Sequence, residues 1–185
     1  MRDFKRKMTK EDDGSRCPLM GASKAVSMLD DAYMLIIGTE ECTYYTKSTQ
    51  TVKGVGHNCF SVVLDNQDVT FGSVDKVENA AIELIEEYNP KSLFLITTCV
   101  VEIVGDDFNK LREDLCQKYN IEVQIIQTNH FSGENENDGF DKVFKSSSNL
   151  QMPNKLQMLM KKMKNKGNMD KSQMMEMKRQ KRGMM

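Results

Sequence analysis

The apolar run LFLIT at residues 93–97 restricts the fold of this 185-residue chain more than any other feature. Uninterrupted apolar strands are typical of parallel sheets that helices cover on both faces. Other strand-like runs and the helix-like apolar spacings alternate with it along the chain: strands at 33–37, 60–64 and 121–126, helices at 74–88 and 108–119. Because short connections join these segments, we predict an α/β fold, a Rossmann-like three-layer domain with a mainly parallel sheet.

Local signals place the ends of the predicted helices. Ser73 precedes the first helical stripe, and Asn89-Pro90 stops it because proline disfavours helical geometry in the residue before it. Asp106 or Asp107 is predicted to cap the helix that follows. A further helix is expected over 22–29.

The charges divide the chain into three parts. Residues 1–14 read as a charged arm, and residues 15–150 hold 11 basic against 21 acidic groups. Residues 151–185 hold ten basic groups against two acids, with ten of the 15 methionines. We predict a domain over 15–148 and a basic, Met-rich tail over 149–185, disordered or helical. One alternative is that this tail binds nucleic acid or an anionic membrane.

Targeting signals and nucleotide loops are missing from the sequence. No run of about 18 apolar residues occurs, and the charged N-terminus lacks the apolar core of a secretion signal, so we expect a cytoplasmic protein that does not span a membrane. The five cysteines are then thiols or metal ligands rather than disulfides. Without a GxxxxGK[ST] loop, the chain is not expected to bind ATP itself.

Three cysteines stand in connecting segments. Cys99 follows the strand at 93–97, Cys42 follows the strand at 33–37 and a short turn, and Cys17 precedes Pro18. Ligands of doubly wound sheets bind beyond the carboxyl ends of the strands, and helix N-termini stabilise thiolates there. Thiolates from separate loops are able to converge on an iron–sulfur cluster.

Other interpretations of the cysteines stay open. A single cysteine is usually a small apolar core residue, and we read Cys116 in that way. His57 and Cys59, with Cys42, are an alternative zinc set, although no second ligand pair has matching spacing. Gly54-Val55-Gly56 is a weak nucleotide-binding signal.

Five segments together resemble the nitrogenase component 1 family over roughly residues 15–145. They are CPLMGA (17–22), IIGTEEC (36–42), DVTFGSVDKVENAAIEL (68–84), TTCVVEIVGDD (97–107) and QTNHFSGENENDGF (127–140). The resemblance implies a nitrogenase-like oxidoreductase component for electron transfer rather than a complete enzyme, in an anaerobe. It also implies an iron–sulfur cluster, 4Fe–4S or larger, at an interface with a second, identical or different, nitrogenase-like subunit.

By the same resemblance, Cys17, Cys42 and Cys99 match the three cluster-binding cysteines, and electrons come from a separate ATP-dependent iron protein. No residue is assigned as catalytic. Family members commonly have glycine directly before the second cysteine, whereas this chain has Glu40 and Glu41. If these acids lie near the cluster, they lower its reduction potential; the alternative is that they point into water. A second functional reading is a non-catalytic cluster-binding scaffold or a truncated family member, since relatives continue through further domains.

Overall fold

The computed structural model describes residues 17–52 and 58–146. Its elements follow in the order α1 (Pro18–Val26), β1 (Ala32–Gly38), α2 (Glu40–Val52), β2 (Cys59–Val63), α3 (Asn66–Phe71), α4 (Val74–Tyr88), β3 (Ser92–Thr97), α5 (Cys99–Val104), α6 (Asn109–Tyr119), β4 (Glu122–Gln127), η3 (His130–Ser132) and α7 (Glu136–Ser146). The Met-rich tail, the N-terminal arm, the Gly-Val-Gly motif and His57 lie outside the described residues.

The four strands form one parallel sheet in the order β2-β1-β3-β4. β1 pairs on both sides: Ile36 is opposite Ser61 of β2 and opposite Ile96 of β3. Every residue of β3 is buried, as expected for a strand covered on both faces. The predicted α/β fold with a parallel sheet is confirmed.

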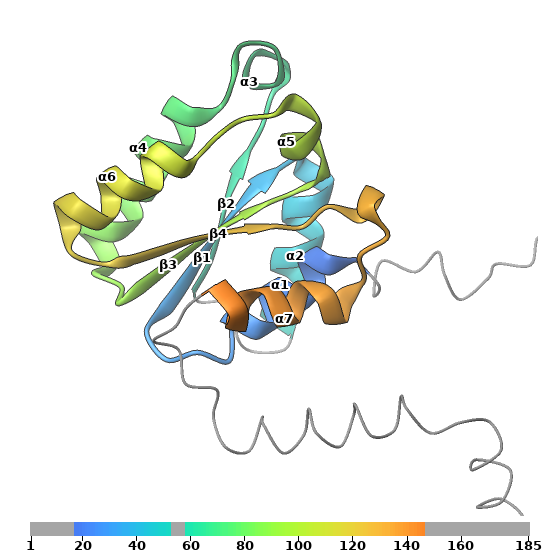
Figure 1. The fold of residues 1–185 in the computed structure, drawn as a ribbon, viewed down its shortest axis with the longest axis horizontal. Coiled ribbons are helices and arrows are strands. Elements are labelled where there is room, and N and C mark those ends of the chain that lie inside the picture. Colours follow the sequence, from blue (N-terminus) through green and yellow to red (C-terminus); the bar gives the residue numbers. More distant parts are fainter. Residues whose placement is uncertain (1–16, 53–57, 147–185) are drawn as a thin grey trace, which may run out of the picture. The chain divides into compact units, whose positions relative to one another are not determined.

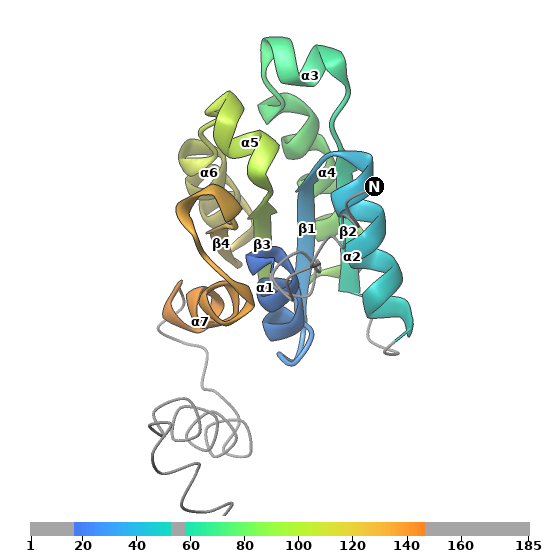
Figure 2. The same ribbon diagram turned by 90° about the vertical axis from the view of Figure 1, so that its right-hand side faces the viewer.

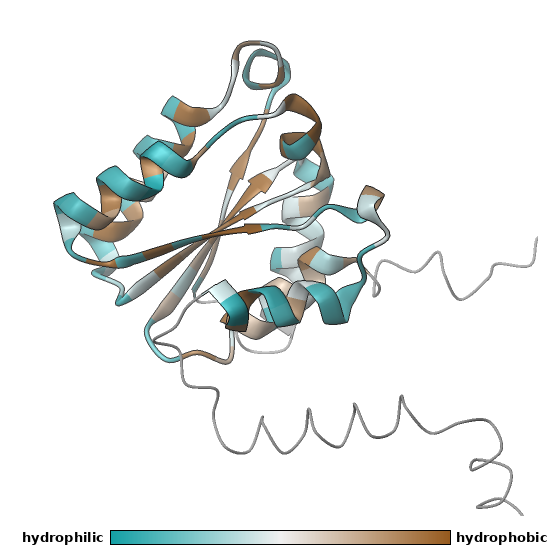
Figure 3. Ribbon diagram, viewed as in Figure 1, coloured by the Kyte–Doolittle hydropathy of each residue, from teal (hydrophilic) through white to brown (hydrophobic). Residues whose placement is uncertain are grey.

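Helices cover both faces of this sheet. Figure 1 shows α4 and α6 on one side and α1, α2 and α7 on the other. The core on the α4 and α6 side joins strand residues such as Leu35 and Leu95 to Val77 and Leu115. In Figure 3 the strands are largely hydrophobic, whereas the outer faces of α4 and α6 are hydrophilic. These layers leave the ends of the strands open for a site.

The predicted helices mostly have the expected bounds. α4 begins after Ser73 and ends at Tyr88, with Asn89 in the left-handed conformation. The predicted cap of α6 is wrong by one residue, since Phe108 is its N-cap and Asp107 accepts a hydrogen bond from the Asn109 backbone at 2.9 Å. The Ser73 side chain donates to Asp106 instead of capping α4. Two expectations were wrong by several residues. α1 begins at Pro18 instead of residue 22, because proline is well suited to the first turn of a helix. α2 begins at Glu40, so the residues just before Cys42 are helical and do not form the expected turn.

Helices α1 and α7 cross at very close range. A Cβ atom at Gly139 of α7 would overlap the backbone of Pro18 in α1. Val143 of α7 is fully buried, and Lys24 of α1 pairs with Glu136 at 3.7 Å. The crossing holds the start of α1 against the end of the chain's described part.

Candidate functional site

The strand order places a switch point between β1 and β3. From β1 the chain passes outward to β2 and then returns to β3 on the other side of β1. In open α/β sheets, ligands bind at such a point, beyond the carboxyl ends of the strands. Cys42 lies in the first turn of α2, directly after β1, and Cys99 is the first residue of α5, directly after β3. The topology therefore brings two of the predicted site cysteines to this end.

Cys17 joins them from a third element. It is the N-cap residue of α1, and its carbonyl accepts a hydrogen bond from the Met20 backbone at 3.0 Å. Burial raises the pKa of the Cys17 thiol; the Leu19 amide acts in the opposite direction, and charges on Cys99 and Cys42 raise this pKa further. Charges act in this way only at short range, because Coulomb energy falls with distance and is screened. Cys17 thus lies within electrostatic range of Cys42 and Cys99.

The walls of this site are tightly fitted around Cys99. Thr98, the N-cap residue of α5, donates its backbone N–H to the Ile37 carbonyl at 3.0 Å and packs over Gly38. A Cβ atom at Gly38 would overlap the Thr98 side chain, so glycine is required at the end of β1. The Thr98 hydroxyl is buried and has no hydrogen-bond partner.

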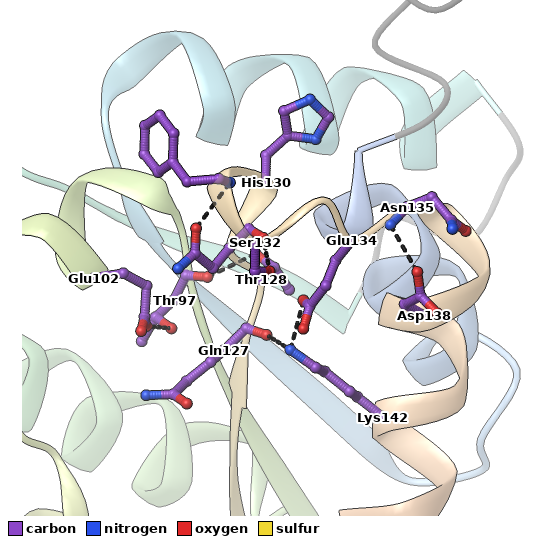
Figure 4. A network of polar contacts seen from close by, with 12 residues as sticks. Thr97, Glu102, Gln127, Thr128, His130, Ser132, Glu134, Asn135, Asp138 and Lys142 are labelled. Carbon is purple, nitrogen blue, oxygen red and sulfur yellow. Dashed lines mark hydrogen bonds and ion pairs between the residues drawn. The ribbon is translucent and has the colours of Figure 1, made fainter.

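Hydrogen bonds tie the end of β4 to the end of β3. Thr128 donates its hydroxyl to the Thr97 carbonyl at 2.6 Å, and Thr97 donates its own hydroxyl to Glu102 of α5 at 2.5 Å. Figure 4 shows these contacts, together with Lys142 of α7, which binds Glu134 at 2.6 Å and the Gln127 carbonyl at 2.7 Å. The loop after β4 is thereby anchored beside α5.

The donor types at this end of the sheet are thiols from three different elements. Within residues 17–52 and 58–146, no three His, Cys, Asp or Glu side chains are arranged around one metal ion. A zinc ion needs its ligands about 2.0–2.3 Å from one point, whereas the cysteines of an iron–sulfur cluster bind different irons and stand further apart. Three half-buried thiols on separate elements fit the second case.

The other two cysteines belong to the fold. Cys59 is buried in β2, and burial raises the pKa of its thiol to about 11. Cys116 of α6 is half-buried against the core, as predicted. Glu40 and Glu41 are exposed; a hydrogen bond from the Glu41 backbone amide, followed by one from the Thr39 hydroxyl, lowers the pKa of Glu41.

Exposed apolar side chains surround the thiol end, and the sequence pattern did not reveal them. Figure 2 shows α3 and α5 beyond the same end of the sheet. Phe71 of α3 is 87% exposed, Ile103 of α5 is 68% exposed, and Phe131 of η3 is 70% exposed. Single exposed apolar residues are ordinary, but these three lie on α3, α5 and η3, the elements that directly follow β2, β3 and β4. No positive sequence pattern marks these three residues, because each lies outside the apolar positions of a helical core stripe.

The family model for nitrogenase component 1 type oxidoreductases matches residues 17–169. The chain belongs to this family. It is 33% identical to the nitrogenase iron-molybdenum cofactor biosynthesis protein NifE of Methanosarcina barkeri, over 67% of this chain and 27% of that protein. It is 25% identical to light-independent protochlorophyllide reductase subunit N of Heliobacterium mobile, over 60% of this chain and 26% of that protein.

A solved structure shares the fold of this family member. The structure titled nitrogenase Cp1 at pH 5 superposes with a TM-score of 0.59 at 23% identity, covering 70% of this chain and 28% of that one. The chain therefore spans about a quarter of the relatives it matches. Among the described residues, no helix combines the length and hydropathy needed to cross a membrane.

Proposed function

We propose that this chain is the electron-transfer component of a nitrogenase-like oxidoreductase, with Cys17, Cys42 and Cys99 as ligands of an iron–sulfur cluster of the 4Fe–4S type or larger. What supports this proposal is the placement of Cys42 and Cys99 just beyond the carboxyl ends of β1 and β3, with Cys17 at the N-cap of α1 within electrostatic range of both. Membership of the nitrogenase component 1 family supports it.

The residues of the chain divide the work at this site. Each of the three cysteines lies at the cap or in the first turn of a helix, α1, α2 or α5, where the helix dipole favours a thiolate; at Cys17 burial opposes this effect and raises the pKa. Gly38 and Thr98 close the base of the site. Bound there, a cluster would supply a one-electron relay between an ATP-dependent iron protein and a partner subunit.

A partner subunit completes the proposed assembly. Three thiolates leave one iron of a four-iron cluster without a ligand from this set. The exposed side chains of Phe71, Ile103 and Phe131 lie on α3, α5 and η3, which follow the carboxyl ends of the strands, and would offer apolar area to a second nitrogenase-like subunit, identical or different. The iron protein would approach the same assembly to deliver electrons.

A second candidate is a non-catalytic scaffold that holds a cluster without passing electrons to a substrate. The similarity to a cofactor biosynthesis protein favours this alternative. The two candidates share the cysteine site and differ in whether reduction by an iron protein and MgATP is followed by oxidation by a partner.

Anaerobic reconstitution with iron and sulfide tests the shared site. We expect the parent protein to bind iron and acid-labile sulfide, and Cys17→Ala, Cys42→Ala and Cys99→Ala each to lose most of the iron. Cys116→Ala is the matched control, because this thiol packs against the core. Equal iron loss in all four variants, or an iron-free parent protein, would contradict the proposal.

A further inference from the structure

The loop after β4 forms a wall of the thiol site that the three cysteines do not supply. Thr128 is 1% exposed and makes two bonds to the Thr97 carbonyl, from its backbone N–H at 3.1 Å and from its hydroxyl at 2.6 Å. Thr97 lies two residues before Cys99. The backbone after Thr128 is therefore held in a fixed position relative to the Cys99 sulfur.

His130 contacts that sulfur through its backbone. Its N–H donates to Cys99 Sγ at 3.5 Å, and the Cys99 thiol in turn donates to the Thr128 carbonyl at 3.9 Å. His130 is the first residue of η3, where backbone N–H groups have no partner within the helix. The next amide, of Phe131, is taken by the Asn129 side chain at 2.9 Å. The His130 amide is thus left to the sulfur.

The imidazole of His130 takes no part in this contact. The residue is exposed, and in Figure 4 its ring points away from the Gln127, Glu134 and Lys142 contacts. Cys99 differs here from Cys17, whose thiol pKa is lowered in part by backbone amides of its own helix, at Leu19 and Met20. The contact on Cys99 comes from a different strand and depends on the packing of β4 beside β3.

We propose that the His130 backbone amide is a positioning and tuning group for Cys99, an inference that rests on the proposed function of the thiol site. Hydrogen bonds to ligand sulfurs are among the factors that set cluster potentials. An N–H donor stabilises the more negative, reduced form, because hydrogen bonds to charged acceptors are the stronger ones. The amide thereby raises the reduction potential, while the imidazole contributes nothing to it.

Two substitutions separate the amide from the imidazole. His130→Pro removes the N–H and fits the backbone, because Asn129 is extended, with φ −97° and ψ 104°, and proline is tolerated in a first helical turn. His130→Ala keeps the N–H and removes the imidazole. Circular dichroism and thermal unfolding of both variants check that each still folds.

The first arm uses the metal-free protein and reads the hydrogen bond directly. Amide exchange at residue 130, followed by NMR, should be slow in the parent protein and in His130→Ala. It should be at least about tenfold faster in Cys99→Ala, with Cys42→Ala as the control that leaves it slow. Equal exchange rates in the parent protein and Cys99→Ala would overturn the proposal.

The second arm uses the cluster-loaded protein and voltammetry. His130→Pro should make one-electron reduction about tenfold less favourable, a shift of about 59 mV to more negative potential, while His130→Ala stays within error of the parent protein. An equal shift in both variants would assign the effect to the imidazole, and no shift in either would remove the tuning role; each overturns the proposal. If the parent protein binds no iron, the proposed function fails, and the first arm still decides whether the amide holds Cys99.

Discussion

The pKa of Cys17 reflects its burial and its nearness to the other two predicted site cysteines. This pKa is raised by burial and by the two other thiols, although Cys17 lies at the beginning of the first described helix. Strand ends in the sequence predicted the positions of Cys42 and Cys99, and the family resemblance added Cys17. Neither gave any indication of the His130 amide, because that contact depends on how the chain turns after β4, and the residues there carry no periodic pattern.

Glu41 gives a pH-dependent contribution to stability at the start of α2. Its pKa is lowered in the folded protein by its own backbone amide and by the Thr39 hydroxyl. A lowered folded pKa means stabilisation that is present above the ordinary carboxyl pKa and is lost as the pH falls through the lowered value. We expect the difference in unfolding free energy between the parent protein and Glu41→Gln to shrink as the pH falls from 7 to 3.

Chemical unfolding at several pH values measures this difference. Thr39→Ala removes one of the two donors and should reproduce part of the same pH dependence. A difference between the parent protein and Glu41→Gln that stays constant from pH 7 to pH 3 would show that the carboxylate makes no such contacts in solution.

At the scale of elements, the segments with a regular apolar pattern were predictable and the short helices without one were not. β1, β3, α4 and α6 agree closely with the expected ranges, because burial on a sheet or along one helical face leaves a regular apolar pattern. α3 has no buried residue and depends on a capping box between Asp65 and Asp68. Hydrophobic periodicity therefore had no means of detecting it.

Helix α7 was missed for a different reason. Its buried residues are Gly139 and Val143, so a glycine stands where an apolar side chain would mark the stripe. The crossing with α1 requires that glycine, since α1 backbone occupies the space of a side chain. Gly139 thus both removes the apolar pattern that would have predicted α7 and allows α7 to pack against α1.

We predict that Gly139→Ala destabilises the protein by about 1–3 kcal/mol through overpacking against the α1 backbone. Asn137→Ala, at an exposed position of the same helix, is the matched control and should change stability little. Urea unfolding measures both. A Gly139→Ala protein within about 0.5 kcal/mol of the parent protein would mean that α1 and α7 separate without cost.

For the whole molecule, one end of the sheet carries both the thiols and the exposed apolar side chains. Ile103 lies on the helix that begins with Cys99. Burying it against a partner is favourable, and a charge at its position would oppose that burial. Association and cluster binding are therefore expected to involve the same surface.

We predict that the cluster-loaded protein sediments as a species larger than a single chain of 21.2 kDa. Ile103→Glu should weaken this association at least about tenfold, whereas Met28→Glu should not, because Met28 lies just before β1, at the opposite end of the sheet. Iron content measured alongside separates loss of association from loss of the site. A cluster-loaded parent protein that sediments as a single chain would contradict the shared surface.

The strand order also makes the assembly of the thiol site depend on the folding of the sheet. β3 lies between β1 and β4, so β4 joins the sheet only through β3. A chain in which β3 had not yet entered would present Cys17 and Cys42 without Cys99. Any group that needs all three thiols would then bind only to completely folded chains, and its binding would stabilise the complete sheet.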